Sequence, residues 1–298
     1  MKKLFFVIIF FLLIVSLIIS KFFYNTLLVS FKHTVKANNQ RDFNVLILGK
    51  PGPGYIGSEN TDSILVAHFV KDQKKVFLIP IPRDLIVENE NGDLEKINAL
   101  YGEKNIKLLL NKASLFTGLD INNFLVVDIR LIKKIVDFLG GIEIVLDAPV
   151  VDAASFYYLP KGKVKLDGEL TELVLRSRFN SEGDFFRIKN QIKVLQALQQ
   201  KILSLSFASQ LQLVAFVFNN KYDWETNMRK EDLLVLFNEF RNDMRDITFK
   251  PIIVDLKSGV LRSGYFTIKN FANVYGIYPL GGVDHYLYVK AYIQSQMK

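Results

Sequence analysis

The chain has 298 residues, of which 50% are hydrophobic and 23% charged, so we expect a folded protein of one large or two small domains and not a disordered chain. Cysteine is absent, which excludes disulfides, a cysteine nucleophile and thiolate metal sites. The formal net charge of +8 fits an acidic partner such as nucleic acid, an anionic lipid surface or a phosphorylated polymer, although many basic domains have no such partner.

The N-terminus predicts a membrane anchor. Lys2 and Lys3 precede an uncharged apolar run, Leu4–Ser20, at the short end of the roughly 17–25 residues that span a bilayer. No small-x-small cleavage site follows, and a run that is apolar on every face needs lipid around it, so an uncleaved anchor is favoured over a signal peptide or a core helix. The lysines favour a cytoplasmic N-terminus. We expect a single-pass protein of the cytoplasmic membrane with three parts: an anchor at 1–21, a stalk at 22–42 and an extracytoplasmic domain at 43–298.

The remaining chain alternates strand patterns with helix patterns. Short runs of β-branched and other apolar residues predict buried strands at 43–49, 63–70, 75–81, 124–129 and 142–149. Apolar residues at helical spacing predict helices at 106–118, 130–141, 184–205, 229–244 and 283–296. Gly140 near the end of the second helix is a C-terminal helix signal. This alternation indicates one domain with a layered α/β fold around a mixed sheet.

Polar residues stand where several predicted elements begin or end. Asp62 immediately precedes a predicted strand. Arg83 and Asp84 follow a proline, and because proline cannot continue a central ladder, Arg83 is expected at an edge or end of the sheet. Lys96 and Asn98 precede a helical pattern. Open α/β sheets bind their ligands in loops at strand ends, so all five residues are candidates for a site.

One stretch, LRSRFNSEGDFFRIKNQ, is rich in arginine, the residue suited to bidentate contact with phosphate or carboxylate. Arg176 and Arg178 would share a face if their segment ends as a strand. Asp184, Arg187 and Gln191 lie at helical spacing and share one face of a helix. The alternative is a solvated ion pair on a helix surface, worth only about 0.2–0.5 kcal/mol.

Other motifs give weaker indications. The glycine-rich segment 49–57 follows a strand but matches neither phosphate-loop pattern, so we expect a loop, one that could line a site. The three histidines are too scattered for a histidine-rich metal site, and His68 is expected to be packed within a strand. No helix-turn-helix or RNP pattern is visible, which argues against nucleic acid as the partner.

Taken in order, the blocks of this sequence resemble the LytR-CpsA-Psr family. They read NVLILG, TDSILV, IPRD, KINALYG, VVDIRLIKKIVDFLGGIEIVLDAP, LPKGKVKLDGE, RSRF and GDFFRIKNQIKVLQAL. Each block alone is unspecific, whereas the ordered set behind one predicted anchor is highly specific. The resemblance covers roughly residues 43–205, and IYPLGGVDHYLYVKAYI is similar to a closing segment of the family.

The resemblance implies an α/β/α sandwich around a central mixed sheet, with a hydrophobic groove for a lipid tail. It also implies a membrane-anchored phosphotransferase of the bacterial envelope. Such an enzyme moves a glycopolymer from a polyprenyl-pyrophosphate carrier to a hydroxyl group of peptidoglycan or another cell-wall acceptor, forming a phosphodiester. By position, Asp62 would bind Mg²⁺, and the pyrophosphate would be held by Arg83, Arg176, Arg178, Arg187 and Gln191. Lys96 and Asn98 would support the site, and Asp84 or Asp184 would orient arginines or accept the acceptor's proton.

Three positions depart from the family's pattern. The loop after Leu48-Gly49 reads KPGPGYIG, where the family often has an Asp and an Arg. Asn60 stands where an Arg commonly precedes Thr-Asp, and Asn190 stands where a second helical Arg is usual. A second carboxylate for Mg²⁺ is therefore not evident. Two interpretations stay open: the transferase, or a catalytically weak relative that binds polyprenyl pyrophosphate or an anionic wall polymer.

Overall fold

The computed structural model describes residues 42–54, 57–152, 157–178, 183–229, 247–269 and 271–298. The expected anchor, nearly all of the expected stalk and nearly all of the helix predicted at 229–244 lie outside the described residues. Within the described ranges, no helix has both the length and the apolar character needed to cross a bilayer.

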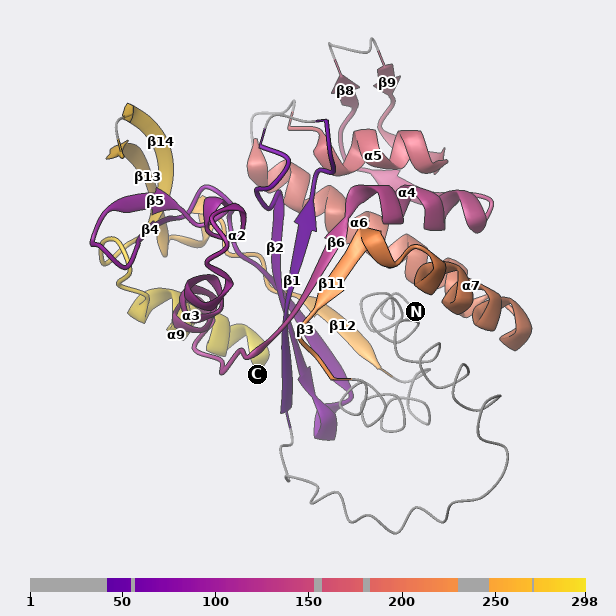
Figure 1. Ribbon diagram of the computed structural model, residues 1–298, viewed down its shortest axis with the longest axis horizontal. Helices are drawn as coiled ribbons and strands as arrows, with labels where there is room; N and C mark the ends of the chain where they lie inside the picture. Colours follow the sequence, from indigo (N-terminus) through magenta and orange to yellow (C-terminus); the bar gives the residue numbers. More distant parts are fainter. Residues whose placement is uncertain (1–41, 55–56, 153–156, 179–182, 230–246, 270) are drawn as a thin grey trace.

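A six-stranded mixed sheet forms the centre of the fold (Figure 1), with strand order β11-β6-β1-β2-β3-β12. The strands are β1 (Asp42–Lys50), β2 (Ser63–Val70), β3 (Lys75–Pro80), β6 (Asn123–Asp128), β11 (Trp224–Thr226) and β12 (Thr248–Pro251). β1 is parallel to β6 and β3 is parallel to β12, whereas the other three pairings are antiparallel. The predicted mixed sheet is therefore confirmed.

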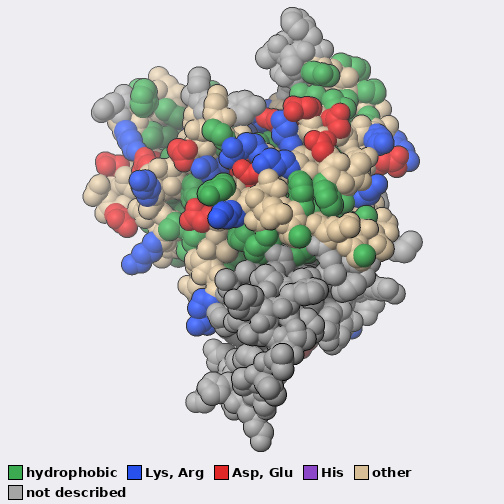
Figure 2. Space-filling model, turned by 45° about the vertical axis from the view of Figure 1, so that its right-hand side comes forward, with side chains coloured by type: hydrophobic (Ala, Val, Ile, Leu, Met, Phe, Trp, Pro, Cys, Tyr) green, Lys and Arg blue, Asp and Glu red, His purple; other side chains and the backbone are tan. Residues whose placement is uncertain are grey.

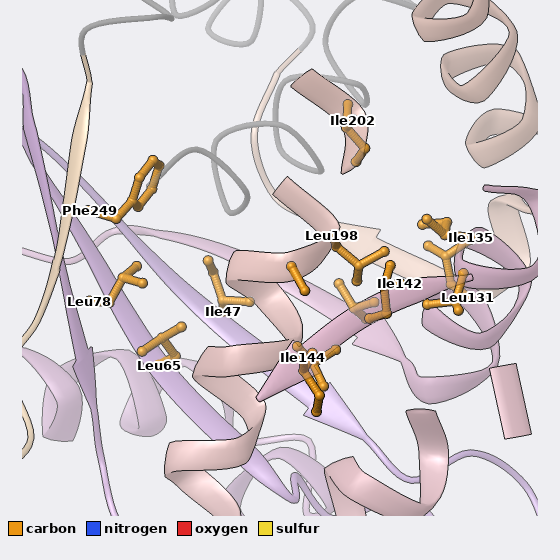
Figure 3. Packing of buried hydrophobic residues seen from close by; sticks show 14 of the residues in the cluster. Ile47, Leu65, Leu78, Leu131, Ile135, Ile142, Ile144, Leu198, Ile202 and Phe249 are labelled. Atoms are coloured by element: carbon orange, nitrogen blue, oxygen red, sulfur yellow. The ribbon is translucent and has the colours of Figure 1, made fainter. Parts of the chain in front are cut away.

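Helices and two small two-stranded sheets cover one face of the central sheet. The elements of this layer are α4 (Ile129–Phe138), α5 (Gly168–Arg176), α6 (Asp184–Leu203), α7 (Phe207–Asn219), β7 (Ile142–Leu146) paired with β10 (Gly162–Leu166), and β8 (Val150–Asp152) paired with β9 (Tyr157–Leu159). Figure 3 shows Ile47 and Leu78 of the sheet on the same side as Leu198 of α6, and all three belong to one buried cluster. Burial of these apolar side chains holds the layer against the sheet.

The opposite face carries a second layer and a second buried cluster. Its elements are α2 (Ala99–Gly102), α3 (Ile106–Thr117), α9 (Leu287–Met297), the pair β4 (Ile86–Glu88) and β5 (Leu94–Lys96), and the hairpin β13 (Leu261–Ile268) and β14 (Phe271–Pro279). Short 3-10 turns occur at η1 (Lys71–Gln73), η2 (Lys221–Asp223) and η3 (Leu256–Ser258). Successive β1 residues alternate between the two clusters, as Leu46 and Ile47 do, because side chains of a strand alternate between faces.

Most predicted elements form near their expected bounds, and two differ. The strand expected at 142–149 forms as β7 but pairs with β10 outside the central sheet. The last helix begins at Leu287 and not at 283, because Asp284 has a left-handed backbone (φ +60°) that cannot open a helix. The signal at Gly140 is confirmed, since this residue has φ +72° just after α4.

Candidate functional site

Strand pairing brings Asp62 and Arg83 together beyond the ends of β2 and β3, two interior strands of the central sheet. The end of β1 pairs with the start of β2 (Gly49 with Ser63), and the start of β2 pairs with the end of β3 (Leu65 with Pro80). The residues that flank these strand ends, Asp62 before β2 and the turn after β3, therefore lie together. The backbone fixes Asp62 further, because its N–H donates to the Gly49 carbonyl at 2.7 Å.

Three arginines converge on the Asp62 carboxylate. Arg83 Nη1 donates to Asp62 Oδ1, while Arg178 Nη2 lies 3.6 Å and Arg187 Nη1 3.8 Å from the same oxygen. The arginines come from the turn after β3, the segment after α5 and the first turn of α6. We call Asp62, Arg83, Arg178 and Arg187 the arginine cluster. The sequence prediction grouped these four residues, and the structure brings them together.

Two further carboxylates contact the arginine cluster. Asp184 binds Arg187 Nη2, and its Oδ1 lies 3.8 Å from Arg178 Nε. Asp84 accepts from Lys96 Nζ at 2.7 Å and lies 3.9 Å from Arg83 Nε. The alternative of a solvated ion pair at 184 and 187 is wrong, because the Arg187 side chain is only 2% exposed and that of Asp184 is 9% exposed.

Burial removes hydration from two arginines of the cluster. Desolvation lowers the pKa of Arg187 to about 10, against the opposing effect of Asp184. Desolvation also lowers the pKa of Arg178, and repulsion from Arg83 adds to that effect. Cations that repel one another in a poorly hydrated space bind an added anion strongly, since the anion relieves both penalties. Figure 2 shows Lys and Arg side chains gathered with carboxylates near the middle of one face of the molecule.

An apolar pocket of about 100 Å³ opens beside Asp62, between the sheet and α4, α5 and α6. Its apolar lining consists of Ile47, Leu48, Pro51, Leu125, Val127, Ile129, Ile132, Leu175, Val194 and Leu195. Its polar lining consists of Lys50, Asp62, Ser63, Arg176 and Gln191, with the Gly49 backbone. We call it the apolar pocket. Gly49 and Pro51 of the glycine-rich segment line this pocket.

The expectation of a strand ending at Arg176 and Arg178 is wrong. Helix α5 extends to Arg176, because Asp167 caps its start by accepting from Leu170 N at 2.8 Å and because Val174 is buried on its inner face. Arg178 lies beyond the helix. The two arginines therefore do not share a strand face: Arg178 joins the cluster, while Arg176 lines the apolar pocket and donates to Glu172 Oε1 at 3.1 Å.

The remaining predicted residues have supporting positions. Gln191 lines the apolar pocket and donates to the Leu175 carbonyl at 3.2 Å. Asn98 acts through its backbone, whose carbonyl accepts from Thr61 N at 3.1 Å and so helps to place Asp62. His68 is packed as expected, 5% exposed and stacked on Phe77.

Sequence reasoning missed Lys50, which lines the apolar pocket. Its Nζ binds Glu59 at 2.9 Å and lies 5.6 Å from the centre of the Tyr101 ring. The sequence signal for Lys50 was its position directly after Gly49, at the end of the strand that pairs with β2 beside Asp62.

Asn190 stands where the family usually has an arginine. It is 1% exposed, and its Nδ2 has no hydrogen-bond partner among the described residues.

The side chains available as metal ligands limit how Mg²⁺ could bind near Asp62. Among the residues that the structure describes, no group of three or more His, Asp or Glu side chains is placed to hold a metal ion. Asp62 lines the apolar pocket, but its Oδ1 already contacts three arginines. Mg²⁺ accepts one or two carboxylates when phosphate oxygens and waters complete its shell. The residues therefore fit Mg²⁺ only together with an anion that neutralises the arginines.

Comparison with known proteins gives consistent matches. Residues 24–268 match the LytR_cpsA_psr family, so the match begins within the segment expected to be a stalk. A curated relative is the polyisoprenyl-teichoic acid–peptidoglycan teichoic acid transferase TagU of Enterococcus faecalis, which is 26% identical over 223 residues, covering 74% of this chain and 72% of that protein.

Solved structures share the fold. TagV of B. subtilis aligns with a TM-score of 0.64 at 23% identity, covering 86% of this chain and 97% of that one. A structure of TagT bound to LIIa-WTA aligns with a TM-score of 0.65 at 19% identity, covering 86% of this chain and 91% of that one. These likenesses confirm the expected mixed α/β architecture.

Proposed function

Because this chain belongs to the LytR-CpsA-Psr family, we propose that it transfers a glycopolymer from a polyprenyl-pyrophosphate carrier to a hydroxyl group of the cell wall, such as one of peptidoglycan, forming a phosphodiester. The observation that carries this proposal is the convergence of three arginines on Asp62 beside an apolar pocket. The relative named as a teichoic acid transferase and the fold relative bound to LIIa-WTA support it.

The two halves of the proposed donor match two neighbouring surfaces. The apolar pocket would hold the first part of the prenyl chain, since ten of its lining residues are apolar. The arginine cluster would hold the pyrophosphate, because forked guanidinium groups match phosphate oxygens in pairs. Arg176 and Gln191 line the pocket that would hold the chain, close to where the pyrophosphate begins, and would contact the phosphate nearer the lipid.

The proposed reaction is a displacement at the phosphorus that carries the glycopolymer. The acceptor oxygen forms a bond to this phosphorus, the bond to the bridging oxygen breaks, and polyprenyl monophosphate leaves with the electron pair. Arg83, Arg178 and Arg187 would stabilise the charge on the phosphoryl oxygens. Mg²⁺, held by Asp62 and phosphate oxygens, would supply further neutralisation of that charge.

Asp184 would accept the proton of the attacking hydroxyl. Its Oδ2 is buried and has no hydrogen-bond partner among the described residues, whereas Asp84 accepts from Lys96. Burial raises the pKa of Asp184, against the opposing effect of Arg187, which makes its carboxylate a better proton acceptor.

Filling the apolar pocket tests this account. Leu175→Trp places a large side chain into the space proposed for the prenyl chain. We expect KM to rise about tenfold or more for a long-chain donor, and to change little for a donor with a very short chain, because only the former needs the pocket. Steady-state assays with donors of different chain length measure this difference.

Leu173→Trp is the matched control, because Leu173 is also a partly buried leucine of α5 but does not line the apolar pocket. It should affect both donors equally. An equal loss with long-chain and short-chain donors in Leu175→Trp would contradict the assignment of the pocket to the prenyl chain.

We also propose that the chain is anchored in the cytoplasmic membrane through residues 4–20, with its C-terminal domain outside the cytoplasm. A reporter that is active only outside the cytoplasm, fused after Lys298, should then be active. A reporter that is active only in the cytoplasm, fused at the same place, should be silent. The reverse pattern would overturn the proposed location and remove access to a lipid-linked donor on the outer surface.

A further inference from the structure

A second pocket touches the arginine cluster at Arg178 and shares no lining residue with the apolar pocket. It has a volume of about 360 Å³ and lies between the start of α6, the turn after β3, η3 and β14. Its lining residues are Asp84, Arg178, Gly183, Asp184, Phe185, Asp255, Leu256, Lys257, Tyr275 and Ile277. We call it the Tyr275 pocket. The matched family range ends at residue 268, so β14 and its Tyr275 lie beyond it.

Arg178 lies near a carboxylate of each pocket. Its Nη2 lies 3.6 Å from Asp62, which lines the apolar pocket, and its Nε lies 3.8 Å from Asp184, which lines the Tyr275 pocket. Asp62 does not line the Tyr275 pocket, and Asp184 does not line the apolar pocket. A phosphoryl group held by Arg178 would therefore lie near both pockets.

In-line displacement requires the attacking and leaving oxygens to lie on opposite sides of the phosphorus. If the leaving polyprenyl phosphate occupies the apolar pocket, the attacking hydroxyl needs a separate approach, and the Tyr275 pocket offers one because the two pockets share no lining residue. Asp184, whose free Oδ2 would take the proton, lines that pocket.

The chemistry of the Tyr275 pocket suits a saccharide. The carboxylates of Asp84, Asp184 and Asp255 can accept hydrogen bonds from sugar hydroxyls, and the side chain of Tyr275 is 42% exposed. The Tyr275 ring meets the ring of Tyr265 nearly edge-on, with centroids 6.1 Å apart at 74°. Tyr265 is 74% exposed and would extend this aromatic surface along the hairpin. Aromatic rings offer flat apolar surfaces for the C–H faces of sugar rings.

We propose that the Tyr275 pocket binds the acceptor saccharide, with Tyr275 as its stacking surface. This inference rests on the proposed transferase function and names the second substrate's site. A donor sugar is the competing occupant, and kinetics with separate variation of donor and acceptor distinguish the two.

The test measures transfer by the full-length protein to a soluble peptidoglycan oligosaccharide. Tyr275→Ala should raise KM for the acceptor about five- to tenfold, with KM for the donor changed less than twofold. Tyr275→Phe, which keeps the ring, should recover most of the acceptor affinity. Tyr288→Ala, at a tyrosine that is 51% exposed on α9 and outside the pocket, should match wild type in both constants.

Two results would overturn the inference. A raised KM for the donor with an unchanged KM for the acceptor would assign the pocket to the donor's sugar. Unchanged constants in Tyr275→Ala would remove Tyr275 from the site. Absence of transfer by the wild-type protein would instead contradict the proposed function itself, so the two failures are distinguishable.

Discussion

Arg178→Lys should lower kcat/KM for glycopolymer transfer about 100-fold or more. Lysine keeps the positive charge but loses the planar fork that reaches phosphoryl oxygens between Asp62 and Asp184. Loss of one donor aimed at developing charge typically costs about 10²–10³ in rate. The side chain of Arg178 is 37% exposed, so its replacement should leave the melting temperature nearly unchanged.

Arg130→Lys is the matched control. Arg130 also contacts two carboxylates, Asp128 at 3.0 Å and Asp223 at 3.2 Å, but lines neither the apolar pocket nor the Tyr275 pocket. It should retain transfer within about twofold. A loss of activity in Arg178→Lys that follows a comparable loss of folding would support a structural ion pair in place of a phosphate contact. Arg187 is less suited to this test, because its side chain is buried and its replacement would also lower the free energy of unfolding.

Asp62→Asn should abolish the coupling between Mg²⁺ and donor binding, and lower transfer about 100-fold or more. Because three arginines crowd Asp62 Oδ1, Mg²⁺ should bind weakly to the wild-type site without donor and tightly with it, and each ligand should raise affinity for the other by the same factor. Asparagine removes the carboxylate charge but leaves Arg83, Arg178 and Arg187, so donor affinity without Mg²⁺ should be retained or increased. Calorimetric titration of Mg²⁺, with and without a short-chain polyprenyl pyrophosphate, measures both effects.

Asp147→Asn provides the control for loss of one negative charge, because the Asp147 side chain is 74% exposed and contacts Lys193. It should leave the coupling intact. Tight Mg²⁺ binding by the donor-free wild-type protein would show that another carboxylate completes the site. Coupling that persists in Asp62→Asn would remove Asp62 from the metal site, and transfer that is independent of Mg²⁺ would contradict the metal's role but not that of the arginines.

The predicted strand ends correctly indicated where the residues of the candidate site lie. Asp62 and Arg83 were placed at strand ends by hydrophobic runs that stop beside them, and the sheet joins those ends through local pairing of β1, β2 and β3. The helical spacing of Asp184 and Arg187 likewise holds, because the apolar residues of α6 fix which of its faces are buried.

Burial and long-range neighbours could not be read from the sequence. Spacing alone cannot distinguish a solvated Asp184–Arg187 pair from a buried one, since α6 contributes to both buried clusters. The Tyr275 pocket joins residues of η3 and β14 to the start of α6, which are separated by many residues in the chain. Strand β7 was placed correctly along the chain but its partner β10 was not foreseen, because pairing depends on the tertiary arrangement.

The identity of the reaction products under single turnover tests the central claim most directly. The protein would be mixed with a polyprenyl-pyrophosphate-linked saccharide and a peptidoglycan oligosaccharide in water enriched in oxygen-18, and the products analysed by mass spectrometry. We predict polyprenyl monophosphate and a saccharide joined to the acceptor through a phosphodiester without the heavy isotope, because the acceptor hydroxyl and not water attacks phosphorus. A saccharide phosphate that carries oxygen-18, or an intact donor that stays bound without transfer, would contradict the claim.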